Sequence, residues 1–147
     1  MRFFSDKCPS CGTKGIRVES DTVIHHVKDI SQMADVSYSY CPNRKCNVIY
    51  FHNKEILTTS MINKEVGIKD QSSDHSIICY CYNYLKSELY EKSLIDKINI
   101  RIGYYGNRCD LRNPSGRCCL IDIKKAQDEK EEEELYDIFR KKSDGNS

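Results

Sequence analysis

Near its start the chain reads Cys8-Pro9-Ser10-Cys11-Gly12. Two thiolates with two residues between them can bind one metal ion if the turn that joins them is tight. Pro9 restricts the backbone at the beginning of that turn, and Gly12 tolerates the positive φ that follows the second cysteine. The pattern therefore predicts a metal-binding knuckle.

A second pair of cysteines, Cys41 and Cys46, completes a set of four, with 29 residues between the two pairs. This spacing fits a closed tetrahedral site, and four protein thiolates leave no position open for a substrate. We therefore expect a structural Zn²⁺ ion. Its predicted ligands are Cys8, Cys11, Cys41 and Cys46.

Spacing leaves two alternatives open at this site. Iron is compatible with the same tetrathiolate geometry. Either His25 or His26 can replace one cysteine, and only one of them can face the metal, because neighbouring side chains of a strand point to opposite faces. Arg44 and Lys45, in the turn of the second pair, are expected to offset part of the thiolate charge.

Composition limits the class of protein. The chain has 147 residues, a formal net charge of +1 and 39% hydrophobic residues. The balance of charge argues against a nucleic-acid binder that works through bulk positive charge. We find no apolar run of about 18 residues, so no membrane span is expected, and the first residues lack the apolar stretch of a secretory signal. A cytoplasmic protein is predicted, and there cysteines bind metals more often than they form disulfides.

The cysteines that follow residue 78 indicate a second centre. The total of nine cysteines is odd, and two sites of four thiolates with one cysteine left over fit that number. Cys79-Tyr80-Cys81 is too short for the usual zinc knuckle, but such a pair can hold one iron of a [2Fe–2S] cluster, for which four cysteine ligands are the norm. The predicted cluster ligands are Cys79, Cys81, Cys109 and Cys118, with Cys119 as the alternative to Cys118.

The most distinctive run of the chain is Asn113-Pro114-Ser115-Gly116-Arg117-Cys118-Cys119-Leu120. It predicts a tight turn that leads into a helix. Adjacent residues on a helix point about 100° apart, so we expect one of the two cysteines to be the ligand. Residues 98–125 carry six basic residues against two acidic ones, which would offset the cluster charge of about −2. A second zinc ion, a reactive thiol pair and a mixed Cys/His cluster with His75 are the alternatives.

The predicted fold class is α+β, a small β-rich zinc-binding subdomain followed by a small helical [2Fe–2S] subdomain. Alternating and β-branched residues favour strands at 15–19, 22–27, 36–40 and 47–51. Apolar residues at helical spacing predict a helix that begins at Asn83, and the polar stretch 68–75 predicts a linker or exposed loop. Further helices are expected at 117–126 and 128–142. The predicted divisions are 1–67 for the zinc subdomain, 76–126 for the cluster subdomain, and 127–147 for an acidic C-terminal helix and tail.

Taken in order, these motifs show a family resemblance. The Cys8–Gly12 knuckle, the Cys41/Cys46 turn, the Cys79/Cys81 pair and the run 113–120 resemble the N-terminal domain of archaeal CopZ-type copper chaperones, and the cluster half is similar to bacterioferritin-associated-ferredoxin-like domains. The resemblance implies a structural zinc ion, a redox-active [2Fe–2S] cluster and a link to copper handling. The Met-x-Cys-x-x-Cys loop with which that family carries copper does not occur in this sequence, so we expect a redox partner rather than a copper carrier.

The predicted function is one-electron transfer linked to copper, either by reduction of Cu(II) to Cu(I) or in partnership with a copper chaperone. The alternative is a metal-binding chaperone module for Cu(I) or zinc, in which the metal sites mainly hold the fold. An enzyme is not expected, because the chain has neither a Gly-rich phosphate loop nor an H-E-x-x-H motif. The expected partners are copper ions or a copper-handling protein and a redox partner, with no nucleic acid and no membrane.

Overall fold

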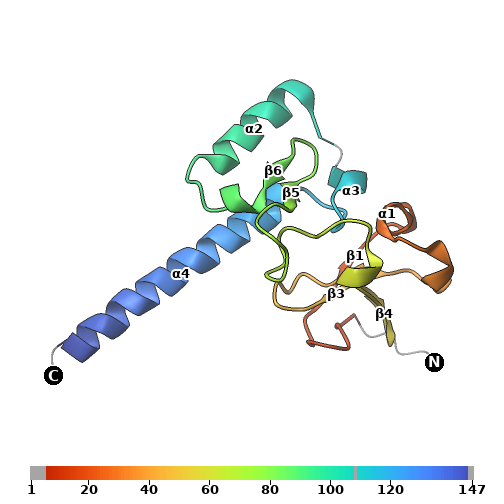
Figure 1. Ribbon diagram of the computed structural model, residues 1–147, viewed down its shortest axis with the longest axis horizontal. Coiled ribbons are helices and arrows are strands. Elements are labelled where there is room, and N and C mark those ends of the chain that lie inside the picture. Colours follow the sequence, from red (N-terminus) through yellow and green to blue (C-terminus); the bar gives the residue numbers. More distant parts are fainter. Residues whose placement is uncertain (1–5, 108, 146–147) are drawn as a thin grey trace.

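A computed structural model gives the fold of the chain (Figure 1). The backbone is described for residues 6–107 and 109–145, and the side chains for residues 6–107 and 111–140. An antiparallel sheet forms the first half, and short strands followed by helices form the second. The α+β fold class is therefore confirmed, with the sheet and its four-cysteine site preceding the helical region.

The main sheet has four strands in the order β1-β2-β3-β4. Its members are β1 (Ile16–Arg17), β2 (Ser39–Tyr40), β3 (Val48–His52) and β4 (Glu55–Thr58). Strands β2 and β3 form an antiparallel hairpin in which Tyr40 pairs with Tyr50. The connection of this hairpin contains Cys41 and Cys46, as the alternation of residues on both sides predicts.

The strand predicted at 22–27 is wrong, because these residues belong mainly to helix α1 (Ser20–His26). Thr22, Val23 and His26 are its buried residues, and their spacing of three and four positions puts them on one helical face. The β-branched residues favour a strand locally, but burial of this face against the rest of the fold outweighs that preference. Two 3₁₀ turns, η1 (Ile30–Gln32) and η2 (Thr59–Met61), complete the first half.

The second half begins with a small hairpin, β5 (Ile77–Cys79) and β6 (Tyr84–Leu85), followed by the 3₁₀ turn η3 (Lys86–Glu88). The helix predicted to start at Asn83 is wrong: Asn83 has a φ of +60° and lies in the turn of this hairpin. The helix, α2 (Leu94–Tyr105), begins 11 residues later, after Ser93. Asparagine is favoured both in left-handed turns and at helix N-caps, so its presence at position 83 does not distinguish a hairpin turn from the start of a helix.

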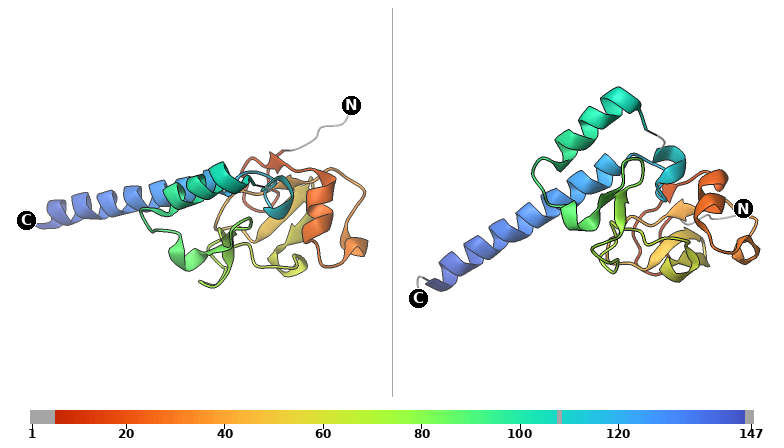
Figure 2. Two further views of the ribbon diagram at one scale, coloured as in Figure 1. Left: turned by 90° about the horizontal axis from the view of Figure 1, so that it is seen from above. Right: turned by 45° about the horizontal axis from the view of Figure 1, so that its top comes forward.

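Two more helices follow, α3 (Cys109–Arg112) and α4 (Cys119–Gly145). The helices predicted separately at 117–126 and 128–142 form one continuous helix of 27 residues. Figures 1 and 2 show α4 leaving the body of the protein, and its side chains at residues 130–140 are exposed. In the part of the chain that the structure describes, no helix is both long and apolar enough to cross a membrane.

One hydrophobic cluster links the two halves of the chain. It contains Val23, Tyr40 and Ile49 from the first half, and Leu89 and Ile98 from the second, all of them fully buried. A smaller cluster surrounds the knuckle and consists of Cys8, Cys41, Cys46, Val48 and Phe51. Residues of both halves share this core, and the division into subdomains at 1–67, 76–126 and 127–147 stays a prediction.

Candidate metal centre

Four sulfur atoms converge beside the main sheet. The Sγ atoms of Cys8 and Cys46 are 3.9 Å apart, and those of Cys11 and Cys41 are 3.5 Å apart. All four lie within 4.8 Å of one another. A tetrahedral zinc ion with bonds of about 2.3 Å separates its sulfurs by about 3.8 Å, whereas a disulfide needs about 2.05 Å. The arrangement therefore fits a tetrathiolate zinc site.

Local backbone bonds fix the knuckle that carries the first pair. The amide of Gly12 donates to the carbonyl of Cys8 at 2.8 Å, and the amide of Cys8 donates to the carbonyl of Thr13 at 2.8 Å. Gly12 has a φ of +77°, the left-handed conformation that its position predicts. These contacts close the turn so that both thiols face the same side.

The second pair is carried by the connection between β2 and β3. The amide of Cys41 donates to the carbonyl of Ile49 at 2.9 Å, which continues the ladder of the hairpin. The amide of Cys46 donates to the carbonyl of Asn43 at 3.1 Å, and the Asn43 side chain accepts from the amide of Lys45 at 3.0 Å. A regular sheet thus delivers one cysteine, and a tight turn delivers the other.

The four thiols differ in their electrostatic surroundings. Burial raises the pKa of the Cys8 and Cys41 thiols. Burial also acts to raise the pKa of Cys11, but polar groups of Thr13 and Asn43 outweigh it and lower that pKa to about 6. Cys11 is also the exposed member of the set. Cys11 therefore ionises more readily than the buried thiols, whose protons a bound metal ion must displace.

Neither histidine alternative joins this group, which consists of four cysteines. His26 is buried, and its Nε2 atom is 2.9 Å from the carbonyl oxygen of Leu111 in α3. Burial, assisted by Lys64 and His25, lowers the pKa of His26 to about 4. Neutral His26 therefore links α1 to α3 instead of holding the metal.

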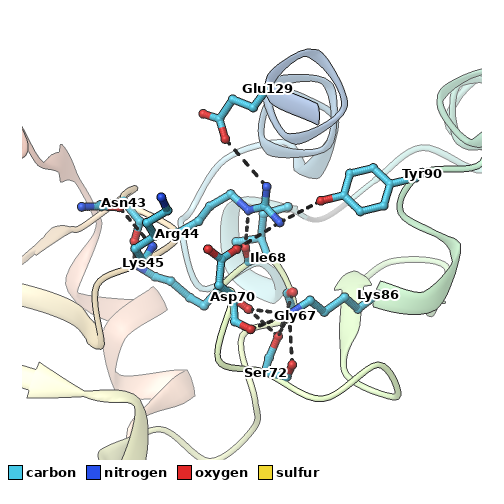
Figure 3. A network of polar contacts seen from close by, with 11 residues as sticks. Asn43, Arg44, Lys45, Gly67, Ile68, Asp70, Ser72, Lys86, Tyr90 and Glu129 are labelled. Carbon is cyan, nitrogen blue, oxygen red and sulfur yellow. Dashed lines mark hydrogen bonds and ion pairs between the residues drawn. The ribbon is translucent and has the colours of Figure 1, made fainter. Parts of the chain in front are cut away.

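Arg44 is committed to neighbours other than the sulfurs. Its guanidinium donates to the carbonyl of Ile68 at 2.8 Å and forms ion pairs with Asp70 at 3.3 Å and Glu129 at 3.7 Å (Figure 3). It also donates to the hydroxyl of Tyr90 at 3.3 Å. Arg44 thus ties the zinc-site turn to α4, and its charge is largely used by two carboxylates.

Lys69 is the charged residue that sequence reasoning missed. It lies in the stretch 68–75 that was predicted to be exposed, yet it is 1% exposed. Its Nζ atom donates to the carbonyls of Cys41 at 2.6 Å, Asn43 at 2.7 Å and Val48 at 3.3 Å. The predicted linker is therefore wrong for its beginning, because Ile68 and Lys69 pack against the metal-site turn. Polar neighbours in the sequence gave no signal of this burial.

Comparison with known proteins agrees with this geometry. A family model described as "Zinc binding domain" (zf_CopZ) matches residues 5–63. Over 118 residues the chain is 31% identical to the copper chaperone CopZ of Archaeoglobus fulgidus. The X-ray structure of the A. fulgidus CopZ N-terminal domain matches with a TM-score of 0.69 and 28% identity, over 82% of this chain and 96% of that one.

This chain is homologous to the CopZ N-terminal zinc-binding domain. The matched region covers 77% of the chain and 57% of the A. fulgidus protein, so the chain spans little more than half the length of that relative. Within this CopZ-type chain, Cys8, Cys11, Cys41 and Cys46 form the zinc site.

Among the described residues, only the first four cysteines lie close enough together to hold a metal ion, and the later cysteines lie in or against the main core. Cys79, at the end of β5, and Cys119, at the start of α4, are each 1% exposed and belong to the main hydrophobic cluster. Cys81 and Cys118 are partly buried and pack against this cluster. Strand β5 contacts α4. Cys109 begins α3, and its side chain lies outside the described residues.

The turn before α4 has the tight geometry that its sequence predicts. The side-chain oxygen of Asn113 accepts from the amide of Ser115 at 3.0 Å and from its hydroxyl at 2.9 Å. Gly116 has a φ of +71° and donates its amide to the carbonyl of Asn113 at 2.8 Å. The hydroxyl of Tyr50 on β3 donates to the carbonyl of Pro114 at 2.5 Å. The main sheet therefore anchors the turn that leads into Cys118 and Cys119.

Proposed function

We propose that this CopZ-type chain holds a [2Fe–2S] cluster in addition to its zinc ion and acts as a one-electron carrier. The cluster ligands that we propose are Cys79, Cys81, Cys109 and Cys118, with Cys119 as the alternative to Cys118. The observation that carries the proposal is the contact between β5, which ends at Cys79, and α4, which begins at Cys119.

The charges around this edge suit an anionic group. Helix α4 is long, and its N-terminal end carries the positive part of the helix dipole. Arg117 precedes it and is paired with Asp122 at 2.7 Å. When bound, a [2Fe–2S] cluster supplies a centre that accepts and releases one electron.

Aromatic residues shield the same edge from water. Arg101 of α2 lies over the rings of Tyr82 and Tyr84, at 5.8 Å and 5.6 Å from their centres. The Tyr82 hydroxyl donates to the carbonyls of Arg101 and Gly106. Burial is the main reason that the pKa of Tyr80 is raised, and Asp122 and Cys119 add to the effect. A partly dry, hydrogen-bonded surround of this kind is one means by which proteins tune cluster potentials.

We further propose that the chain serves copper handling. The relative with 31% identity is named a copper chaperone. We propose a role as electron donor that converts Cu(II) to Cu(I), alone or beside a copper-carrying protein. In the alternative, the chain binds Cu(I) or zinc as a chaperone module and its sulfur centres are purely structural.

The deciding experiment is anaerobic reconstitution of the full chain with Zn²⁺, ferrous iron and sulfide. We expect visible absorbance that bleaches with dithionite, together with an electron paramagnetic resonance signal of the reduced protein. Cys81→Ser should lose this absorbance and keep zinc, whereas Cys11→Ser, the matched control in the other site, should lose zinc. A colourless protein that binds two zinc ions would overturn the proposal.

The copper role is tested separately by mixing the dithionite-reduced, desalted protein with Cu(II) and a colorimetric Cu(I) chelator. We expect one Cu(I) to form for each electron that the protein holds, and none with Cys81→Ser. Comparison of Cys118→Ser with Cys119→Ser then assigns the fourth ligand. Tight Cu(I) binding without any reduction of Cu(II) would favour the chaperone alternative.

A further inference from the structure

Lys69 is a buried residue with a charged side chain. Among the described residues no Asp or Glu lies within ion-pair distance of its Nζ atom, which is surrounded by the carbonyls of Cys41, Asn43 and Val48. The same atom lies 5.3 Å from the centre of the Tyr40 ring. Burying an ammonium group is costly unless an opposite charge is near. Some other anion must therefore stabilise it.

The zinc centre is an anion that the fold can supply beside Lys69, because Lys69 Nζ binds the backbone of the turn that carries two of its ligands. One Zn²⁺ ion and four thiolates carry a net charge of about −2. Two of the carbonyls that Lys69 binds belong to residues of the turn that holds Cys41 and Cys46, and one is that of Cys41 itself. Burial lowers the pKa of Lys69, and the charges of the four cysteines oppose this effect. The lysine is thus held against the dianion by the ligand-bearing backbone.

We propose that Lys69 is the internal counter-charge of the zinc–tetrathiolate centre and a positioning residue for its Cys41–Cys46 turn. The two basic residues of the turn are poorer candidates. Arg44 is paired with Asp70 and Glu129, and Lys45 is exposed to water, where its charge is screened. Lys69 therefore stabilises the metal-bound thiolate form more than the metal-free thiol form.

Zinc affinity, measured by competition with a chelator on the full chain, tests the proposal. Lys69→Met removes both charge and donors, and Lys69→Gln removes the charge while keeping a donor. We expect each variant to bind Zn²⁺ at least tenfold more weakly, which equals about 1.4 kcal/mol. Lys45→Met removes an exposed charge from the same turn and should stay within about twofold of wild type.

Lys86→Met controls for loosening of the loop. The Nζ atom of Lys86 donates to the carbonyls of Lys69, Asp70 and Ser72 from outside the sulfur cluster. This variant should lower stability while leaving zinc affinity within about twofold. Equal losses of zinc affinity in Lys86→Met and Lys69→Met would overturn the proposal, because loosening of the loop would then explain both. Full zinc affinity in Lys69→Gln would also overturn it, because hydrogen bonding rather than charge would then explain the role of Lys69.

A second readout is independent of any change in folding. With iron in place of zinc, the tetrathiolate site carries one more negative charge as Fe(II) than as Fe(III). Lys69→Gln removes a nearby cation and should therefore lower the Fe(III)/Fe(II) potential. Each tenfold change in the affinity of the site for Fe(II) relative to Fe(III) corresponds to about 59 mV. The high-spin ferric signal distinguishes this site from an oxidised [2Fe–2S] cluster. An unchanged potential would contradict the proposal.

Discussion

Replacing Tyr50 by phenylalanine tests how the sheet supports the turn before Cys118. The Tyr50 side chain is fully buried on β3, and its hydroxyl donates to the carbonyl of Pro114 at 2.5 Å. Phenylalanine fills the same space but leaves that carbonyl, which is also buried, without its donor. A buried acceptor left unsatisfied costs about 1–3 kcal/mol, and we expect Tyr50→Phe to lower the free energy of unfolding by that amount.

The assay is urea denaturation of the zinc-loaded protein followed by circular dichroism. For a chain of this size the loss also lowers Tm by about 2–4 °C for each kcal/mol. Hydrogen exchange gives a local readout: the amides of Ser115 and Gly116, which donate to Asn113, should lose protection. Tyr38→Phe is the matched control, because the Tyr38 hydroxyl accepts from the amide of Ala34, away from this turn.

Zinc content should be the same in Tyr50→Phe and in the wild type, since none of the four zinc ligands takes part in the hydrogen bond between Tyr50 and Pro114. Unchanged stability with unchanged exchange at Ser115 and Gly116 would refute the view that β3 anchors the turn. Loss of zinc would show that the sheet, and not the turn, is what Tyr50 supports.

Three further predictions follow from single residues. Arg44→Met should lower the free energy of unfolding by about 1–3 kcal/mol, because the Ile68 carbonyl and Asp70 lose their partner. Lys45→Met, at an exposed residue of the same turn, should lower it by less than about 0.5 kcal/mol. Equal losses in urea denaturation would contradict this prediction. The pKa of His26 is lowered to about 4 from 6.5 by burial, so its neutral form contributes stability above about pH 6.5 that is lost as the pH falls toward 4. His26→Gln should flatten this part of the stability-pH profile, and an unchanged slope would count against it. Gly67→Ala should be destabilising, because its Cβ would meet the backbone carbonyl of Ile77 on β5, while Gly103→Ala, in open space on α2, should stabilise by about 0.5–1 kcal/mol; thermal melts that rank the two the other way would refute this.

The zinc site was predictable because its information is local. Two cysteine pairs with tight turns, and alternating residues on both sides of Cys41 and Cys46, encode the ligands and the hairpin directly. The turn at 113–116 was predictable for the same reason, since Asn, Pro and Gly have distinct backbone preferences. Each of these features depends on neighbours within a few positions.

The features that were missed depend on distant contacts. Residues 22–27 form most of a helix because Thr22, Val23 and His26 are buried on one face, and the His26 ring reaches α3. Lys69 is buried because carbonyls more than 20 positions away in the sequence accept hydrogen bonds from its ammonium group. No pattern within the stretch 68–75 carries that information, since a polar run with a lysine is most often a solvated loop.

The most direct test of the two-centre account is the inorganic content of protein purified without oxygen. We expect about one zinc, two iron and two acid-labile sulfide per chain, with few thiols that react with a thiol reagent before denaturation. Nine titratable thiols with neither metal present, or zinc alone without iron or sulfide, would contradict it.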